Sequence, residues 1–213
     1  MTKREKAAFI AEALEKEYPQ ALCALQYNKD YELLFAVRLS AQCTDERVNK
    51  VAPELFKKYP TLESIAEADI NDVEQIIHSC GFFRAKARDI VLGARMIMDE
   101  FAGKVPDSME ELLRIPGVGR KTANLVLGDV YNMPGAVVVD THCIRITNLL
   151  GLVDTKQPEK IEVMLRELLP PEKSNDFCHR LVLHGRAVCA ANRPDCRACV
   201  IAPWCDHCTG KNE

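Results

Sequence analysis

The sequence predicts an all-α protein, and three patterns indicate this class. Apolar residues recur at helical spacing along nearly the whole chain. A glycine stop and a proline at 103–106 precede Ser108 and, three residues later, Glu111, which is the pattern of a capping box that starts a helix. The only strongly β-branched run, residues 136–139, is too short and too isolated to found a sheet. We expect it to be an extended, buried connector that ends at Asp140.

The expected helices follow one another with little between them. Apolar stripes mark the early helices at residues 9–14, 33–39, 48–56, 76–77 and 90–101, and the capping box opens another at 108. Later helices are expected at 121–131, 141–150, 158–168 and 174–190. With 213 residues, the chain can form one domain or two small ones that share an interface.

Composition excludes some classes of protein and leaves others open. No apolar run approaches the roughly 20 residues that span a membrane, and residues 1–6 do not lead into the apolar core of a signal peptide. We therefore expect a soluble cytoplasmic protein. The net charge of −3 argues mildly against nucleic acid as a partner, yet basic residues outnumber acidic ones in 82–95 and 177–205. Solvated helix faces explain such patches equally well, so charge does not decide the partner.

Ten cysteines are many for this length, and half of them crowd near the C-terminus. Without a secretory signal, such crowding favours a metal over disulfides. Four of them form the pattern Cys189-x6-Cys196-x2-Cys199-x5-Cys205. Ligation by cysteine alone suits tetrahedral zinc or a [4Fe–4S] cluster. Cys208 allows an alternative with two zinc knuckles, although the five-residue gap between the two pairs is short for that arrangement.

The segment from Ile115 to Ala123, Ile-Pro-Gly-Val-Gly-Arg-Lys-Thr-Ala, indicates a tight hairpin between two helices. Proline ends the first helix, and Gly117, Val118 and Gly119 allow the turn before a helix that starts at about Arg120. Backbone N–H groups at such a helix N-terminus suit a phosphate of any nucleotide. An ordinary helical corner, with glycines that only permit the bend, is the alternative.

This string resembles the helix-hairpin-helix of the endonuclease III superfamily almost residue for residue. Val138-Val139-Asp140-Thr141-His142 resembles the segment that follows the hairpin in these proteins, and the cysteine spacing is similar to that of their C-terminal iron–sulfur loop. The resemblance covers roughly residues 5–208. It implies a [4Fe–4S] cluster on Cys189, Cys196, Cys199 and Cys205, with Cys208 as a bystander. The cluster would fix a loop that presents Arg193 to DNA phosphate.

The resemblance also implies a chemical role for Lys121 and Asp140. A neutral lysine amine that attacks C1′ displaces the base and leaves a Schiff base, which permits β-elimination of the 3′ phosphate. A carboxylate stabilises the positive charge that builds on the sugar. Lys121 as a phosphate-contacting lysine and Asp140 as a helix N-cap are the structural alternatives, and capping is compatible with catalysis. His142 is expected to be a core histidine or to support Asp140.

Two further motifs are similar to the parts of this family that open the duplex. Leu39-Ser40-Ala41-Gln42-Cys43-Thr44-Asp45 implies that Gln42 fills the gap left by an everted nucleotide, with Asp45 expected to cap the next helix. Gly81-Phe82-Phe83-Arg84-Ala85-Lys86-Ala87 implies a second wedge at Phe82. Phenylalanine replaces the commoner aliphatic residue there, so packing of Phe82 in the core is an alternative.

The family fold implies two helical domains with a DNA-binding cleft between them. Residues 22–134 would form a six-helix domain with the hairpin, and residues 1–21 with 135–213 would form the cluster domain. Lys121 and Asp140 would then face each other across the cleft. We expect a monomeric, nucleoid-associated enzyme that excises oxidised pyrimidines such as thymine glycol from double-stranded DNA and cleaves the abasic site. The alternatives are an adenine or thymine–guanine mismatch glycosylase, or a non-enzymatic DNA-binding module with structural metal.

Overall fold

Helices provide all the regular secondary structure of residues 1–210, which is the range that the computed structural model describes. Within that range the only β pairing is an isolated bridge between Cys189 and Pro194. The predicted all-α class is confirmed. No helix in the described range is long and apolar enough to cross a membrane.

The chain forms two compact units, Cys23–Tyr131 and Met1–Leu22 with Asn132–Glu213. The first unit contains α2 (Asp30–Ser40), α3 (Asp45–Lys58), α4 (Leu62–Ala66), α5 (Ile70–Ile77), α6 (Phe83–Glu100), α7 (Met109–Leu112), α8 (Arg120–Asp129) and the 3-10 turn η1 (His78–Cys80). The second contains α1 (Lys3–Glu17), α9 (Thr141–Leu149), α10 (Pro158–Leu168), α11 (Ser174–Ala187) and the 3-10 turns η2 (Pro171–Lys173) and η3 (Ala202–Trp204).

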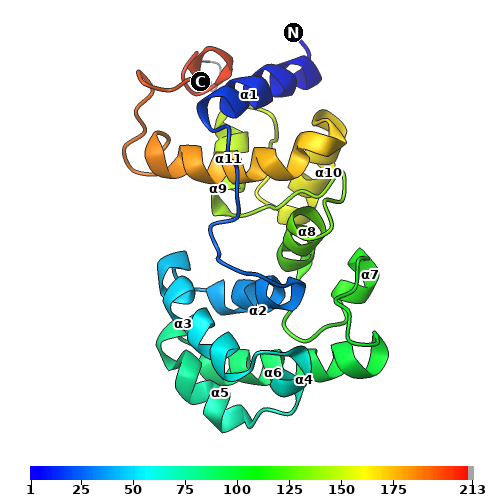
Figure 1. The fold of residues 1–213 in the computed structure, drawn as a ribbon. Coiled ribbons are helices and arrows are strands. Elements are labelled where there is room, and N and C mark those ends of the chain that lie inside the picture. Colours follow the sequence, from blue (N-terminus) through cyan, green and yellow to red (C-terminus); the bar gives the residue numbers. More distant parts are fainter. Residues whose placement is uncertain (211–213) are drawn as a thin grey trace. The chain divides into compact units, whose positions relative to one another are not determined.

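Helix α2 forms the centre of the first unit (Figure 1). It packs against α3, α6 and α8, and all its residues from Tyr31 to Val37, together with Leu39, are buried. Helix α6 covers α4 and α5 on its other side. Two single-turn helices, α4 and α7, raise the number of α-helices in this unit to seven, one more than the resemblance implied.

Capping side chains fix where several of these helices begin. The Thr44 hydroxyl accepts a hydrogen bond from the backbone N–H of Arg47, so Thr44 is the N-cap of α3. The expectation that Asp45 caps this helix was wrong, because Asp45 already has helical backbone and lies in the first turn. Ser108 caps α7 through the N–H of Glu111, as the sequence predicted.

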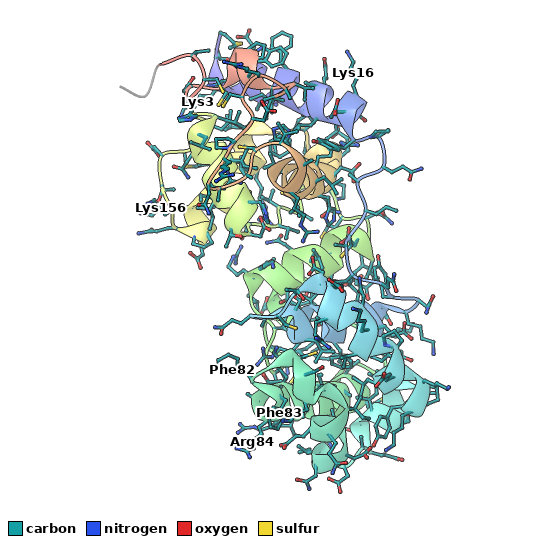
Figure 2. All side chains as sticks on the ribbon, turned by 90° about the vertical axis from the view of Figure 1, so that its left-hand side faces the viewer. Lys3, Lys16, Phe82, Phe83, Arg84 and Lys156 are labelled. Atoms are coloured by element: carbon teal, nitrogen blue, oxygen red, sulfur yellow. The ribbon has the colours of Figure 1, made fainter. Side chains whose placement is uncertain are left out.

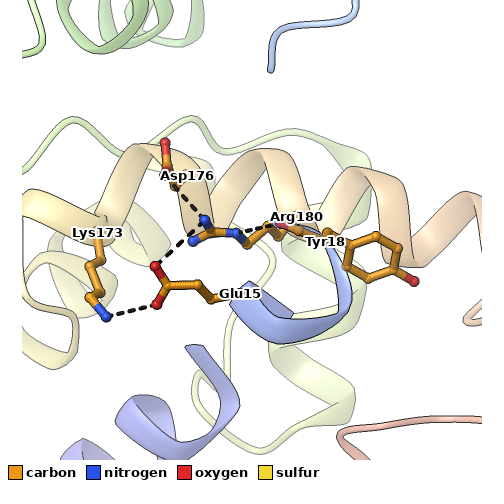
Figure 3. A network of polar contacts seen from close by, with 5 residues as sticks. All are labelled: Glu15, Tyr18, Lys173, Asp176 and Arg180. Atoms are coloured by element: carbon orange, nitrogen blue, oxygen red, sulfur yellow. Dashed lines mark hydrogen bonds and ion pairs between the residues drawn. The ribbon is translucent and has the colours of Figure 1, made fainter. Parts of the chain in front are cut away.

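A network of charged groups holds the N-terminal helix α1 against α11 in the second unit (Figure 3). The Arg180 side chain is only 4% exposed; its Nε donates to the Tyr18 carbonyl, and its guanidinium lies 3.3 Å from Asp176. Glu15 accepts from Lys173 at 2.8 Å. A buried, planar guanidinium with several partners holds its geometry better than an exposed ion pair does. The first residues of the chain are thereby tied to a segment more than 150 positions away.

Residues 136–139 lie between α8 and α9 in the chain. All four are buried and none belongs to a helix or a strand, which confirms the predicted connector. Asp140 follows as the N-cap of α9, as the sequence analysis allowed. Helix α11 ends at Ala187, earlier than the predicted residue 190, because Val188 and Cys189 both donate their N–H groups to the His184 carbonyl.

Candidate active site

The hairpin forms a tight turn that delivers the chain into α8. Val118 N–H donates to the Ile115 carbonyl at 3.1 Å, and α8 begins at Arg120 as predicted. Gly119 is the N-cap and is exposed, so the capping residue has no side chain that would cover the first N–H groups of α8. These donors lie at the positive end of the helix dipole and suit an anion.

Gly117 is the position in the hairpin that requires glycine. Its φ angle is +76°, and a Cβ atom there would lie 2.5 Å from Arg38 Nε and 2.7 Å from Asp89 Oδ2. These two side chains form an ion pair between α2 and α6, with an N–O distance of 2.7 Å. The hairpin therefore rests on a pair of charged residues that sequence reasoning did not identify.

Substitution of Gly117 by alanine is expected to destabilise the protein by about 1–2 kcal/mol or more, from left-handed backbone alone, before the clash with Arg38 is counted. Gly119→Ala is the matched control, since its φ is negative and nothing lies within 4 Å of a Cβ there. Its effect should stay within about 1 kcal/mol. Denaturant unfolding of both variants measures the difference. Equal destabilisation would contradict the assigned role of Gly117.

Lys121 lies in the first turn of α8 with an exposed side chain. Among the described residues, no carboxylate lies within ion-pair distance of its amine. Burial raises the pKa of the nearby Cys23 thiol to about 12, although the positive charge of Lys121 acts to lower it. The thiol is therefore neutral, and it provides no anion that would pair with the amine. Lys121 remains available to a ligand.

Asp140 holds its carboxylate in place with both oxygens. Oδ1 accepts from the N–H of Cys143 at 2.8 Å, and Oδ2 lies 3.1 Å from Nδ1 of His142. The His142 ring packs so closely on Gly185 that a Cβ there would lie 2.6 Å from its Cδ2 atom. His142 thus fixes the orientation of the carboxylate, which supports the expectation that it assists Asp140.

Gln42 and Phe82 both lie at exposed turns with left-handed backbone, at φ angles of 53° and 46°. Phe82 immediately precedes α6 and is 68% exposed, and Figure 2 shows it on the outside of its unit beside Phe83 and Arg84. Packing of Phe82 in the core is therefore excluded. An exposed phenylalanine and an exposed glutamine on strained turns are suited to contact with a partner.

The four cysteines of the C-terminal loop line one pocket together with Cys208 and His184. Apolar side chains, among them Leu149 and Ile201, provide much of the rest of the lining. Arg145 Nη1 donates to Cys189 Sγ at 3.4 Å, and His184 Nε2 lies 3.4 Å from Cys199 Sγ. Within residues 1–210, no group of three or more His, Cys, Asp or Glu side chains lies close enough together to hold one metal ion.

Arg193 lies in the loop between the first two of these cysteines, and its side chain is exposed. The bridge between Cys189 and Pro194 and a hydrogen bond from Asp195 N–H to the Val188 carbonyl close the base of this loop. The loop therefore presents Arg193 to solvent from a defined turn, which suits a phosphate contact.

Residues 35–171 match the model of the HhH-GPD superfamily of base excision DNA repair proteins. Endonuclease III of Synechocystis sp. is 47% identical over 96% of this chain and 93% of its own length. The chain belongs to the endonuclease III family. The structure of a trapped endonuclease III–DNA covalent intermediate matches this chain with a TM-score of 0.91 and 36% sequence identity. The match covers all of both chains. A non-covalent endonuclease III–DNA complex matches equally well, with 99% of that chain covered.

Membership of the endonuclease III family makes the protein a bifunctional DNA glycosylase and abasic-site lyase of base excision repair. Its partner is DNA. The structure places Gly117, Val118, Gly119, Arg120 and Lys121 together at the start of α8. It adds supporting residues that sequence reasoning missed, which are Arg38, Asp89, Arg145 and His184.

Proposed function

We propose that the enzyme excises oxidised pyrimidines such as thymine glycol from double-stranded DNA, with Lys121 as the nucleophile and Asp140 as the stabilising carboxylate. The observation that carries this proposal is the Lys121 amine in the first turn after the hairpin, which is exposed and has no ion-pair partner among residues 1–210. The backbone N–H groups of the same turn would hold a DNA phosphate, so that the sugar lies near this amine.

The reaction follows from the chemistry of the amine. Lys121 attacks C1′ of the sugar, the bond from C1′ to the base breaks, and the base departs with the bonding electrons and takes up a proton. Loss of a proton and opening of the sugar ring leave a Schiff base between Nζ and C1′. The Schiff base acidifies C2′, and removal of a C2′ proton expels the 3′ phosphate by β-elimination. Water then releases the lysine.

Asp140 contributes electrostatic stabilisation. Positive charge develops on the sugar as the base departs, and a preoriented carboxylate lowers the energy of that state. Its hydrogen bonds to the N–H of Cys143 and to His142 hold its orientation without taking up all of its lone pairs. We propose that Lys121 and Asp140 act on the same nucleotide.

Contacts with the rest of the DNA would come from exposed and half-buried residues that take no part in the reaction. The hairpin residues Gly117 to Arg120, and Arg193, suit phosphates, which position a duplex without selecting its sequence. Gln42 and Phe82 suit the space vacated by an everted nucleotide. The aromatic ring at 82 would stack on a neighbouring base, as aromatic side chains do on unpaired bases.

The C-terminal loop suits a [4Fe–4S] cluster on Cys189, Cys196, Cys199 and Cys205. All four thiols line one pocket with an apolar wall, and the Arg145 guanidinium and the His184 ring lie beside two of the sulfurs, where they would stabilise thiolate charge. Bound there, the cluster would supply iron–sulfur bonds that fold the loop and no step of the reaction. Cys208 lines the same pocket as these four thiols.

A cysteine substitution tests this assignment. Cys199→Ser is expected to remove the brown colour and most of the protein-bound iron, and to destabilise the second unit. Cys208→Ser should keep both colour and iron, because the proposed ligand set excludes it. Absorbance and iron analysis of the two purified variants provide the comparison. Bound zinc in the wild type, lost in Cys208→Ser, would favour the two-knuckle alternative.

We further propose that the two compact units are the two domains of the family fold, and that the enzyme acts as a monomer on the DNA of the nucleoid in the cytoplasm. The boundaries of the compact units, at residues 22/23 and 131/132, support such a division. Sedimentation of the purified protein with and without a short lesion-bearing duplex would measure its oligomeric state.

The substrate proposal is tested with four duplexes that differ at one base pair. They contain thymine glycol opposite adenine, normal thymine, an adenine–guanine mismatch and a thymine–guanine mismatch. Only thymine glycol should be released at an appreciable rate, and its strand should be cut on the 3′ side to leave an unsaturated aldehyde. Faster release from either mismatch, without strand cleavage, would favour the mismatch alternative.

A further inference from the structure

Lys86 is fully buried although its side chain carries an amine. It lies in the first turns of α6 with 0% exposure, and its Nζ donates to the carbonyls of Leu39 and Cys80, at 2.8 Å each. Burial lowers the pKa of Lys86. Both the ammonium and the neutral amine have at least two N–H donors, so the two bonds do not depend on which form is present. A buried lysine is unfavourable unless its amine has partners, and here the two backbone carbonyls accept hydrogen bonds from it.

The two carbonyls belong to the ends of two different helical elements. Leu39 lies in the last turn of α2, where carbonyls have no partner within the helix, and Cys80 is the last residue of η1. One amine therefore caps both ends at once, and a cation at these C-termini also complements the helix dipole.

Each of these ends leads directly into a turn that carries one of the proposed DNA contacts. Gln42 follows Leu39 by three positions, and Phe82 follows Cys80 by two. Both are left-handed non-glycine residues, a conformation that persists only where the surrounding structure enforces it. A side-chain hydrogen bond between the thiols of Cys43 and Cys80 forms a second link; burial and the neighbouring Cys43 thiol raise the pKa of Cys80 to about 11. The two turns are thus joined at their bases.

We propose that Lys86 is a positioning residue that fixes the distance between Gln42 and Phe82, so that both enter the same gap in the duplex. The inference rests on the proposed wedge function of these two residues. Lys86 touches no reacting atom. Its loss would leave the chemistry of Lys121 intact and would impair the step in which the nucleotide is held outside the stack.

The test compares excision of a lesion that is paired in the duplex with excision of a lesion that is already unpaired. Single-turnover excision is measured on thymine glycol opposite adenine and on thymine glycol opposite an abasic-site analogue, with enzyme in excess. Unpairing a base costs a few kcal/mol in an intact duplex and least where the base is already unpaired. Lys86→Met should therefore slow excision from the intact duplex by about tenfold or more, and from the unpaired lesion by less than about threefold.

A stability control separates positioning from general damage to the fold. Ile97→Val removes one methyl group from a fully buried residue on the same helix α6, far along the chain from both turns. It should leave the ratio of the two rates unchanged. Hydrogen exchange of the Cys43 and Gly81 amides, which donate to Ser40 and His78, should accelerate in Lys86→Met and not in Ile97→Val.

If Lys86→Met does not fold, Lys86→Gln replaces it. Its amide keeps two N–H donors on a shorter side chain that cannot span both carbonyls, and the same change in rate ratio is expected. Equal slowing on both substrates, or no slowing on either, would overturn the positioning role. Failure of the proposed function has a different signature, because the wild type would then excise thymine glycol from neither duplex.

Discussion

Lys121→Gln is expected to abolish strand cleavage and slow base excision by at least about 10³-fold, the largest loss for any single substitution in this protein. Glutamine keeps a polar side chain, one atom shorter than that of lysine, and cannot form a Schiff base. Because the side chain is exposed at the start of α8, the fold should be unchanged. Excision and cleavage of a duplex with thymine glycol are measured in parallel on one labelled strand.

Arg120→Gln is the matched control for Lys121→Gln, since it removes one positive charge from the adjacent position. It should weaken DNA binding and leave the cleavage rate at saturating enzyme within about tenfold of wild type, because phosphate contacts position the duplex. If Lys121→Gln still cut the strand at a rate close to that of Arg120→Gln, another amine would be the nucleophile.

Asp140→Asn is expected to reduce excision by about 10²–10³-fold with little change in stability. Asparagine is as good an N-cap as aspartate, so its amide oxygen can still accept from the N–H of Cys143. The negative charge that stabilises the sugar in the transition state is lost. Single-turnover rates and thermal unfolding of the same preparation measure the two effects separately.

Asp140→Ala tests the contribution of Asp140 to stability as the N-cap of α9. It removes both the charge and the cap, and should cost about 1 kcal/mol of stability in addition to the catalytic loss. If Asp140→Asn retained full activity while Asp140→Ala was destabilised, the residue would be only a helix cap. That outcome would remove Asp140 from the chemistry.

Local sequence patterns predicted most of the helices, because amphipathic spacing and caps act over a few residues. The start of α8 at Arg120 and the capping of α9 by Asp140 follow from such signals. Where two capping residues compete within one motif, the pattern is ambiguous: Thr44 and Asp45 are adjacent, and the threonine takes the cap. The single-turn helix α4 is too short for periodicity to reveal it.

The supporting contacts of the site could not be predicted in the same way. The Arg38–Asp89 pair beneath the hairpin joins positions 51 residues apart, and Lys86 reaches a carbonyl 47 residues away. The sequence contains one indication that Lys86 is buried. Lys86 lies four positions before Ile90, on the apolar face of α6. A lysine on a buried face indicates a partner without identifying it. Such partners depend on tertiary packing, which periodicity does not encode.

Borohydride reduction during turnover tests the nucleophile most directly. Sodium borohydride converts the Schiff base to a stable amine, so enzyme incubated with a thymine glycol duplex and then reduced should carry the DNA covalently. Proteolysis and mass spectrometry should place the adduct on Lys121, and Lys121→Gln should form none. An adduct on any other residue, or an equal yield from the variant, would contradict the mechanism proposed for this enzyme.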